Sequence, residues 1–398
     1  MSFVHPAFGA HRPRDLQTPT PVPDNPRTRM ARRLPPFVQP FLTWLTAMPA
    51  PGEAPVERNA LAFVVGALLW IAAGSAASAA PFLFAEPPLL AWLLVPAGMV
   101  ATCSGLGLLQ VVVFHHCSHN TVFSTRERNR LAGRLVSAVL LFKRFDDYQR
   151  EHMLHHSPNK LLTHEDEFAN FVLGLCRLEP GAPKRVLWRR LAWNLVSPAF
   201  HARFMAARIR SSLLTGDRSH DLVGIGFWVT AFAAAFAAGA VPALLCAWVL
   251  PVTVLLQIAT VFRILCEHRF PEPSLLEARG KEFVCEATMG VFPGSAPPDA
   301  SAGTAAGLLR WAAWWLDMLT VQFFVRVFVL VGDAPCHDFH HRRPATRRWT
   351  DYIHARQRDA EAGSPGFPAG YSESWGLFNA VDGNLATLAA TPRAALDR

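Results

Sequence analysis

Four long apolar runs constrain the fold of this chain more than any other feature. They cover residues 61–82, 89–114, 222–239 and 241–262. A helix needs about 20 apolar residues to cross the hydrocarbon core of a bilayer, and three of the runs reach that length. The third run is slightly shorter but carries no charge. Charged residues make up only 17% of the chain, so we predict an all-α integral membrane protein with four transmembrane helices.

The charges around the four runs predict their orientation. The short joints between the first and second runs and between the third and fourth contain no Lys or Arg, whereas the other flanks are basic. Basic residues collect on the cytoplasmic side of membrane proteins. We therefore expect two transmembrane hairpins in the inner or cell membrane, with both termini and the central segment 115–221 in the cytoplasm.

The net charge of +8 is compatible with nucleic-acid binding, an anionic membrane surface or this cytoplasmic bias. The basic residues flank apolar runs rather than forming one stripe, which favours the bias. No nucleic-acid partner is expected. The seven cysteines contain no C-x-x-C pair and give no sign of a disulfide framework.

The remaining segments are more polar. Residues 1–57 are rich in Pro and Arg and contain no signal-peptide core. They predict a largely disordered cytoplasmic tail, with one interfacial helix around 37–48. The apolar stretch 308–331 contains Arg310, Asp317 and Arg326, so we expect it to lie on or partly in the membrane surface. A fifth span is the alternative, and it would separate the last histidine cluster from the others.

Three histidine clusters carry the chemistry. Each begins or lies near the predicted cytoplasmic face, and spacings of three and four place their side chains on one helix face. The clusters are His115/His119, His152/His155/His156 and His337/His340/His341. One such cluster is often a solvated surface feature, but three on one face argue against chance. A structural zinc takes four ligands, so this number of imidazoles predicts two metal ions with positions left open.

These clusters resemble the histidine boxes of the membrane fatty-acid desaturases and hydroxylases, H-x(3–4)-H, H-x-x-H-H and [HQ]-x-x-H-H. The second box continues as His155-His156-Ser157-Pro158-Asn159 and then Glu165-Asp166-Glu167, which is similar to the family pattern. The resemblance implies four spanning helices under a cytoplasmic helical cap that holds two irons. It implies a membrane domain at 58–360, followed by a C-terminal cytoplasmic segment at 361–398.

The resemblance also extends the ligand set. It selects His115 and His119 rather than His116, because the family has an acidic or variable residue at the second position of the first box. It implies that His268, after the fourth run, is a ninth ligand, with an interfacial histidine as the alternative. The chain departs from the family at Ile264, where Asn is usual.

Carboxylates near the boxes are candidates for orienting the ligands. Metal-bound imidazoles usually donate their second N–H to a carboxylate or carbonyl. The candidates are Asp147, Glu151, Asp166, Glu267 and Asp338. Ordinary solvated charges are the alternative for each.

The family resemblance implies an O2-dependent di-iron desaturase of fatty acyl chains or similar lipids. A di-iron hydroxylase or ketolase of an apolar substrate is the alternative, and a membrane metal transporter or sensor is a remote one, because the runs hold few polar residues besides Gln110 and Gln257. The chain shows no ferredoxin cysteine set and no nucleotide-binding glycine fingerprint. A separate electron donor such as ferredoxin is therefore expected. Segment 363–390 either closes over the substrate entrance or forms an amphipathic tail.

Overall fold

The computed structural model describes residues 24–56, 58–299, 303–393 and 396. The described chain is mostly helical. Four of its helices are long and apolar enough to cross a membrane: Ala60–Phe82, Leu89–Ser118, Arg218–Ala237 and Val241–Glu267. They coincide with the four apolar runs, so the prediction of four candidate membrane-spanning helices is confirmed.

These four helices include several tighter or wider turns. The elements are α3 (Ala60–Ala79), η2 (Ala80–Phe82), α4 (Leu89–Gly107), η3 (Leu108–Phe114), α5 (His115–Ser118), α11 (Arg218–Ala237), α12 (Val241–Leu244), η5 (Leu245–Val249), η6 (Pro251–Leu255) and α13 (Leu256–Glu267). Of these, η3, η5 and η6 are π-helical. Small residues let α3 and α4 pack closely, since a Cβ added at Gly98 would lie 2.7 Å from the Gly74 carbonyl oxygen. Their outer faces expose large apolar side chains such as Leu69 and Leu93, as lipid contact requires.

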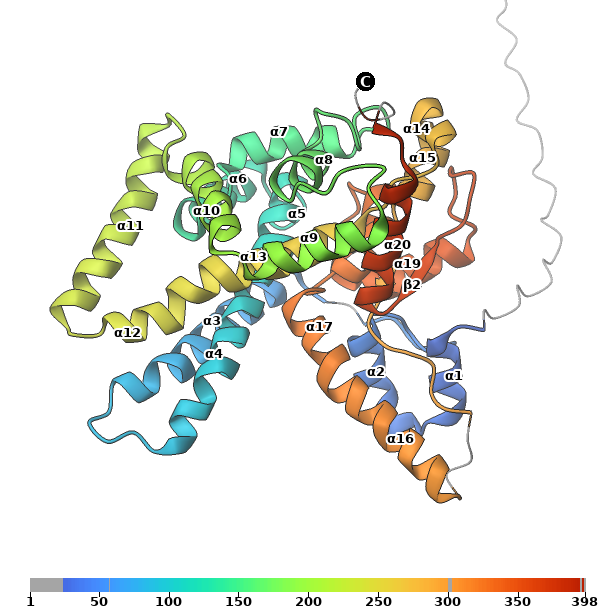
Figure 1. Ribbon diagram of the computed structural model, residues 1–398, viewed down its shortest axis with the longest axis horizontal. Helices are drawn as coiled ribbons and strands as arrows, with labels where there is room; N and C mark the ends of the chain where they lie inside the picture. The colour runs from blue at the N-terminus through green and yellow to red at the C-terminus, as the bar shows by residue number, and fades with distance from the viewer. Residues whose placement is uncertain (1–23, 57, 300–302, 394–395, 397–398) are drawn as a thin grey trace, which may run out of the picture.

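The other elements connect and cover these helices. Between the second and third candidate spans lie α6 (Arg126–Leu140), α7 (Phe145–His155), α8 (Glu167–Ala169), η4 (Asn170–Leu175), α9 (Lys184–Val196) and α10 (Pro198–Leu213). After α13 come α14 (Pro273–Ala278), α15 (Gly280–Ala287), β1 (Gly290–Phe292), α16 (Ala305–Asp317), η7 (Met318–Gln322), α17 (Phe323–Phe328), η8 (Ala334–Cys336), α18 (His337–Arg342), η9 (Arg347–Asp351), α19 (Tyr352–Glu361), β2 (Glu373–Trp375) and α20 (Leu377–Ala390). Figure 1 shows α3 and α4 side by side, extending away from the region that contains α7, α8, α14 and α15.

The described part of the N-terminal segment is helical, both around 37–48, where a helix is expected, and before it, where disorder is expected. It contains α1 (Pro26–Arg33), η1 (Pro36–Val38) and α2 (Gln39–Thr46), while residues 1–23 lie outside the described residues. Arg27 is buried and donates hydrogen bonds to the Met48 carbonyl and the Thr43 hydroxyl, at 3.0 and 2.8 Å. This tertiary network orders a segment whose local composition is typical of disorder.

The charged apolar stretch after residue 303 forms one helical rod, α16–η7–α17, which Figure 1 shows beside α1 and α2. Met318 and Trp314 pack with Leu42 and Leu45 of α2 in one buried cluster. Arg326 is buried, and its Nε donates to the Trp44 carbonyl at 2.9 Å. The charge of Arg326 is therefore satisfied by protein groups, while the opposite side of the rod exposes Leu308, Leu309, Leu316 and Leu319.

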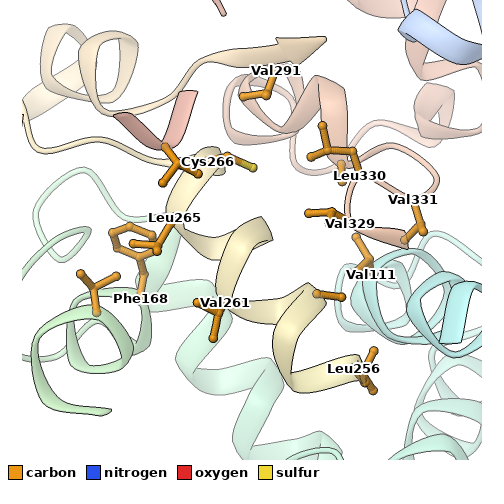
Figure 2. Close-up of a cluster of buried hydrophobic side chains, with 14 of the residues drawn as sticks. Val111, Phe168, Leu256, Val261, Leu265, Cys266, Val291, Val329, Leu330 and Val331 are labelled. Atoms are coloured by element: carbon orange, nitrogen blue, oxygen red, sulfur yellow. The ribbon is translucent and has the colours of Figure 1, made fainter. Parts of the chain in front are cut away.

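A hydrophobic core lies directly behind the histidines. Figure 2 shows its members on η3, α8, α13, β1 and the segment after α17: Val111, Phe168, Leu256, Val261, Leu265, Cys266, Val291, Val329, Leu330 and Val331. Leu265 and Leu330 are fully buried, and each such side chain stabilises the fold by about 1.5–3 kcal/mol. Because this core packs α13 against the chain leading into α18, it brings His268 and the third histidine box together.

The C-terminal segment packs against the same helix. β2 pairs in parallel with β1, with Val291 opposite Ser374. In α20, Asn384 donates through its amide nitrogen to the Leu265 carbonyl at 2.8 Å, and Phe378 contacts Phe262. This segment therefore covers one side of α13.

Candidate metal centre

All nine predicted ligands converge, although they come from four separate segments. His115 begins α5, and His119 follows its last residue. His152 and His155 lie on the last turn of α7, with His156 next in the chain. His268 directly follows α13, and α18 carries His337, His340 and His341.

The nine side chains form two groups. The first consists of His115, His119, His152, His156 and His340, and the second of His155, His268, His337 and His341. Within each group, the candidate ligand nitrogens all lie within 4.8 Å of one another. Pairs of Nε2 atoms approach closely, at 2.7 Å between His115 and His340 and 2.9 Å between His268 and His341.

Each H-x-x-H-H box contributes to both groups. In the second box, the first and last histidines, four residues apart, enter the first group, and His155 enters the second. In the third box, the first and last enter the second group, and His340 enters the first. Residues four apart on a helix project nearly together, whereas neighbouring residues diverge by about 100°. The spacing therefore aims each box at two separate points.

Burial favours the neutral form of several of these imidazoles. All are buried except His119 and His156, which are half-buried. Burial, followed by the charge of His116, lowers the pKa of His119 to about 3. Burial and the neighbouring histidines also hold the pKa values of His152, His340 and His341 well below the usual range. A neutral ring keeps one lone pair free, which metal ligation requires.

A carboxylate orients one of the rings. The His155 Nδ1–H donates to Asp166 Oδ1 at 2.8 Å, which leaves Nε2 of His155 with its lone pair. Asp166 is fully buried and also accepts from the backbone N–H groups of Leu162 and Phe168, at 2.7 and 3.0 Å. The backbone thus fixes the carboxylate, and the carboxylate fixes the ring.

Two cavities adjoin the histidines. The metal-side cavity, about 210 Å³, is lined by residues of both groups, including His115, His152, His155, His268 and His337. The inner cavity, about 400 Å³, runs between η3, α10 and α13. Both are lined by His115, Tyr148 and Ile264. The two cavities therefore adjoin each other beside His115, a member of the first group.

A model of the fatty acid desaturase family matches residues 90–311, more than half of the 398-residue chain. The chain belongs to the fatty acid desaturase family. No curated protein and no solved structure matches it. The matched region contains the first two boxes and His268, whereas the third box lies beyond it and is connected to the site by the geometry alone.

In this desaturase-family chain, the other four predicted orienting carboxylates pair with basic side chains instead. Asp147 accepts from Arg144 and Arg150, Glu151 pairs with Lys143, and Glu267 pairs with Arg263 at 3.3 Å. Asp338 is fully buried and accepts from Arg356 at 2.7 Å. Asp147 and Glu267 pair with cations three or four residues away in the chain. The partners of Glu151 and Asp338 lie eight and 18 residues away, beyond one helical turn.

Two contacts of His116, with Asp333 and Trp349, were not predicted from the sequence. This histidine lies outside both groups, as expected, but its Nε2–H donates to Asp333 Oδ2 at 2.7 Å. Its ring stacks on buried Trp349, with centroids 4.2 Å apart. Asp333 lies four residues before His337. This spacing from the third box is the sequence signal that could have suggested a carboxylate near the site.

The sequence leaves His164, His201, His220 and His354 outside the ligand set and predicts that they lie on the surface. The structure places them differently from one another. His164 is exposed, but His220 and His354 are buried, and His354 donates to Asp351 at 2.8 Å. His201 is half-buried, with Nδ1 2.7 Å from Gln257 Oε1. The expectation was therefore wrong for His220 and His354, because tertiary packing covers them.

The residues present fit two metal ions. Neutral imidazoles whose ring nitrogens face one another cannot all be hydrogen-bonded, since each ring has a single N–H. A cation at the centre of each group would accept the converging lone pairs. Cys117 and Cys336 lie beside the boxes but outside both groups, so the donor set is imidazole, which suits iron or zinc.

Proposed function

We propose that this chain is an O2-dependent di-iron desaturase that introduces a double bond into a fatty acyl chain or similar lipid. The observation that carries the proposal is the division of nine imidazoles into two buried groups at the mouth of a cavity between candidate spanning helices. Electrons would come from a separate donor such as a ferredoxin. Both termini and the site would lie on the cytoplasmic side, in line with the basic flanks.

The two groups would hold one iron each, through five and four histidines. When bound, iron supplies the activation of O2 that attack on an unactivated C–H bond needs. The protein binds the chain in the inner cavity, where Phe114, Phe171 and Leu256 supply apolar walls. Burial of the histidines excludes bulk water, and Asp166 keeps the His155 ring aimed at the second group.

Iron content tests the proposal. The purified chain should hold about two irons, the number expected from two imidazole groups. His340→Ala removes a ligand of the first group and His155→Ala one of the second, so each should lower iron content and abolish activity while membrane insertion persists. His164→Ala, at an exposed position, is the matched control. Full activity in either ligand variant would refute the assignment.

Product analysis tests the reaction. Mass spectrometry of lipids from an expressing host should show the loss of two hydrogens from a chain. A gain of one oxygen would instead identify a hydroxylase. A reporter fused to the C-terminus should be cytoplasmic, and a signal from the other side of the membrane would contradict the proposed topology.

A further inference from the structure

The inner cavity contains two glutamines that the metal site does not use. Gln110 lies on η3 and Gln257 on α13, and both line the cavity. Both belong to candidate membrane-spanning helices, where polar side chains are costly and usually mark a functional site. Their neighbours in the wall include apolar side chains such as Val111, Phe204 and Leu256, and the wall also contains charged residues.

Each amide contains an atom without a hydrogen-bond partner. Gln257 is only 1% exposed, and while its Oε1 lies 2.7 Å from His201 Nδ1, its Nε2 has no partner. If the nitrogen and oxygen of this amide were exchanged, the oxygen would be the atom without a hydrogen-bond partner. Gln110 has a buried Oε1 that likewise has no partner. Buried polar atoms are nearly always hydrogen-bonded, so the cavity offers two places for a ligand group.

The helices that carry the two glutamines also lead to predicted metal ligands. The number of residues between them therefore gives the distance of each amide from the histidines. Gln110 lies five residues before His115, a separation of about 7.5 Å along a helix. Gln257 lies eleven residues before His268, about 16 Å along α13. A chain that reaches the histidines at one end therefore passes the two amides about 7.5 to 16 Å away, measured along the helices.

The charged side chains that line the cavity are already engaged. Lys143 pairs with Glu167, and Arg263 pairs with Glu267. Arg208 donates to three backbone carbonyls: Leu140 at 3.0 Å, Leu141 at 3.0 Å and Val252 at 2.6 Å. No carboxylate of the described residues forms an ion pair with it. Arg208 belongs to α10, and its guanidinium links free carbonyls at the C-terminal end of α6. The neutral amides therefore remain as the groups available to a ligand.

We propose that Gln110 and Gln257 bind an uncharged hydroxyl or carbonyl group on the substrate chain, distant from the carbon that reacts. The inference rests on the proposed function in taking the inner cavity as the substrate site. It identifies the substrate as an oxygen-bearing chain, rather than one whose hydrocarbon end fills the cavity. A hydroxyl can donate to the Gln110 Oε1 or accept from the Gln257 Nε2, and a carbonyl can accept from the Gln257 Nε2. Either contact fixes which carbon lies beside the histidines.

Binding measurements test this without turnover. The probes are octadecanoic acid, a series that carries one hydroxyl or keto group at successive positions, and the corresponding dioic acid. Competition against a fluorescent fatty acid, on purified chain in detergent, gives their affinities. At one position, the hydroxyl or keto chain should bind at least about 10-fold more tightly than the plain chain, because a buried unpaired group is satisfied.

Variants assign the preference to the amides. Gln110→Leu and Gln257→Leu should each bring the preference close to 1, whereas Gln357→Leu, at a half-buried glutamine of α19 outside this cavity, should keep it. Since Gln257→Leu also removes the partner of His201, Gln110→Leu is the decisive variant. Equal binding of plain and oxygen-bearing chains would overturn the inference and indicate that water alone satisfies the amides. Strongest binding of the dioic acid, binding of no chain, or a preference that survives Gln110→Leu would also overturn it.

This outcome is independent of the metal test. A preference for an oxygen-bearing chain in a protein without iron would refute the proposed function and leave the inference standing. A protein with two irons that desaturates plain chains, and shows no such preference, would support the proposed function and refute the inference.

Discussion

Replacement of Asp166 by Asn isolates the contribution of ligand orientation. The substitution keeps the shape of the side chain but replaces one carboxylate oxygen by an N–H2 group. Asp166 accepts three hydrogen bonds, from the His155 ring and from the Leu162 and Phe168 backbone. The amide retains one acceptor, so at least one of these donors loses its partner in a fully buried position.

The expected effect falls on the second group. Loss of an orienting partner typically lowers metal affinity by about 10- to 100-fold, which is roughly 1.4–2.7 kcal/mol. We therefore expect Asp166→Asn to bind its second iron 10- to 100-fold more weakly, measured as iron retained at a series of buffered free-iron concentrations. Asp147→Asn is the matched control, since Asp147 accepts from Arg144 and Arg150. Equal iron retention by the two variants would refute the orienting role of Asp166.

Three further predictions concern stability, each followed by thermal unfolding in detergent. Arg356→Met leaves the buried carboxylate of Asp338 without its partner, so unfolding should cost about 3–5 kcal/mol less; an unchanged midpoint would contradict this. Burial favours a raised pKa for Asp146, but two arginines of α6 outweigh it and lower that pKa from 3.8 to about 2. The stabilisation by the ionised Asp146 is thus complete above about pH 4 and is lost as the pH falls through about 2. Asp146→Asn should lower the free energy of unfolding at neutral pH by about 1 kcal/mol, after allowance for solvent screening. The variant should also lose this acid dependence. Gly74→Leu should separate α3 from α4, since a Cβ there would lie 2.6 Å from the Gly98 carbonyl oxygen, and should reduce the yield of inserted protein; normal yield and midpoint would show that the helices tolerate separation.

The sequence predicts those features that depend on local pattern. Runs of apolar residues identify the four candidate spans, because a spanning helix must present apolar side chains on every lipid-facing side. The histidine spacings identify eight of the nine members of the two groups, since residues three and four apart share a helix face. The resemblance supplied His268, which no spacing within the chain would have singled out.

What the sequence does not predict depends on partners far along the chain. Asp333 and His116 are 217 residues apart, and Asp338 turns toward Arg356 rather than toward a ligand. Similarly, helix α1 is ordered by the bonds of Arg27 to a segment about 20 residues later. A local pattern shows that a charge is present near a site, but only the fold decides which opposite charge it meets.

The distribution of the boxes between the two groups has a consequence for the whole centre. Because α7 and α18 each carry histidines of both groups, the two groups share the same two helices and cannot move independently. A displacement of either helix changes the separation of the two groups together with their ligand geometry. The H-x-x-H-H spacing is therefore more than a means of gathering imidazoles: it holds two sites at a fixed distance. The α13 helix contributes His268 to one site and Gln257 to the inner cavity, so the same rigid element relates the metal pair to the position of a bound chain.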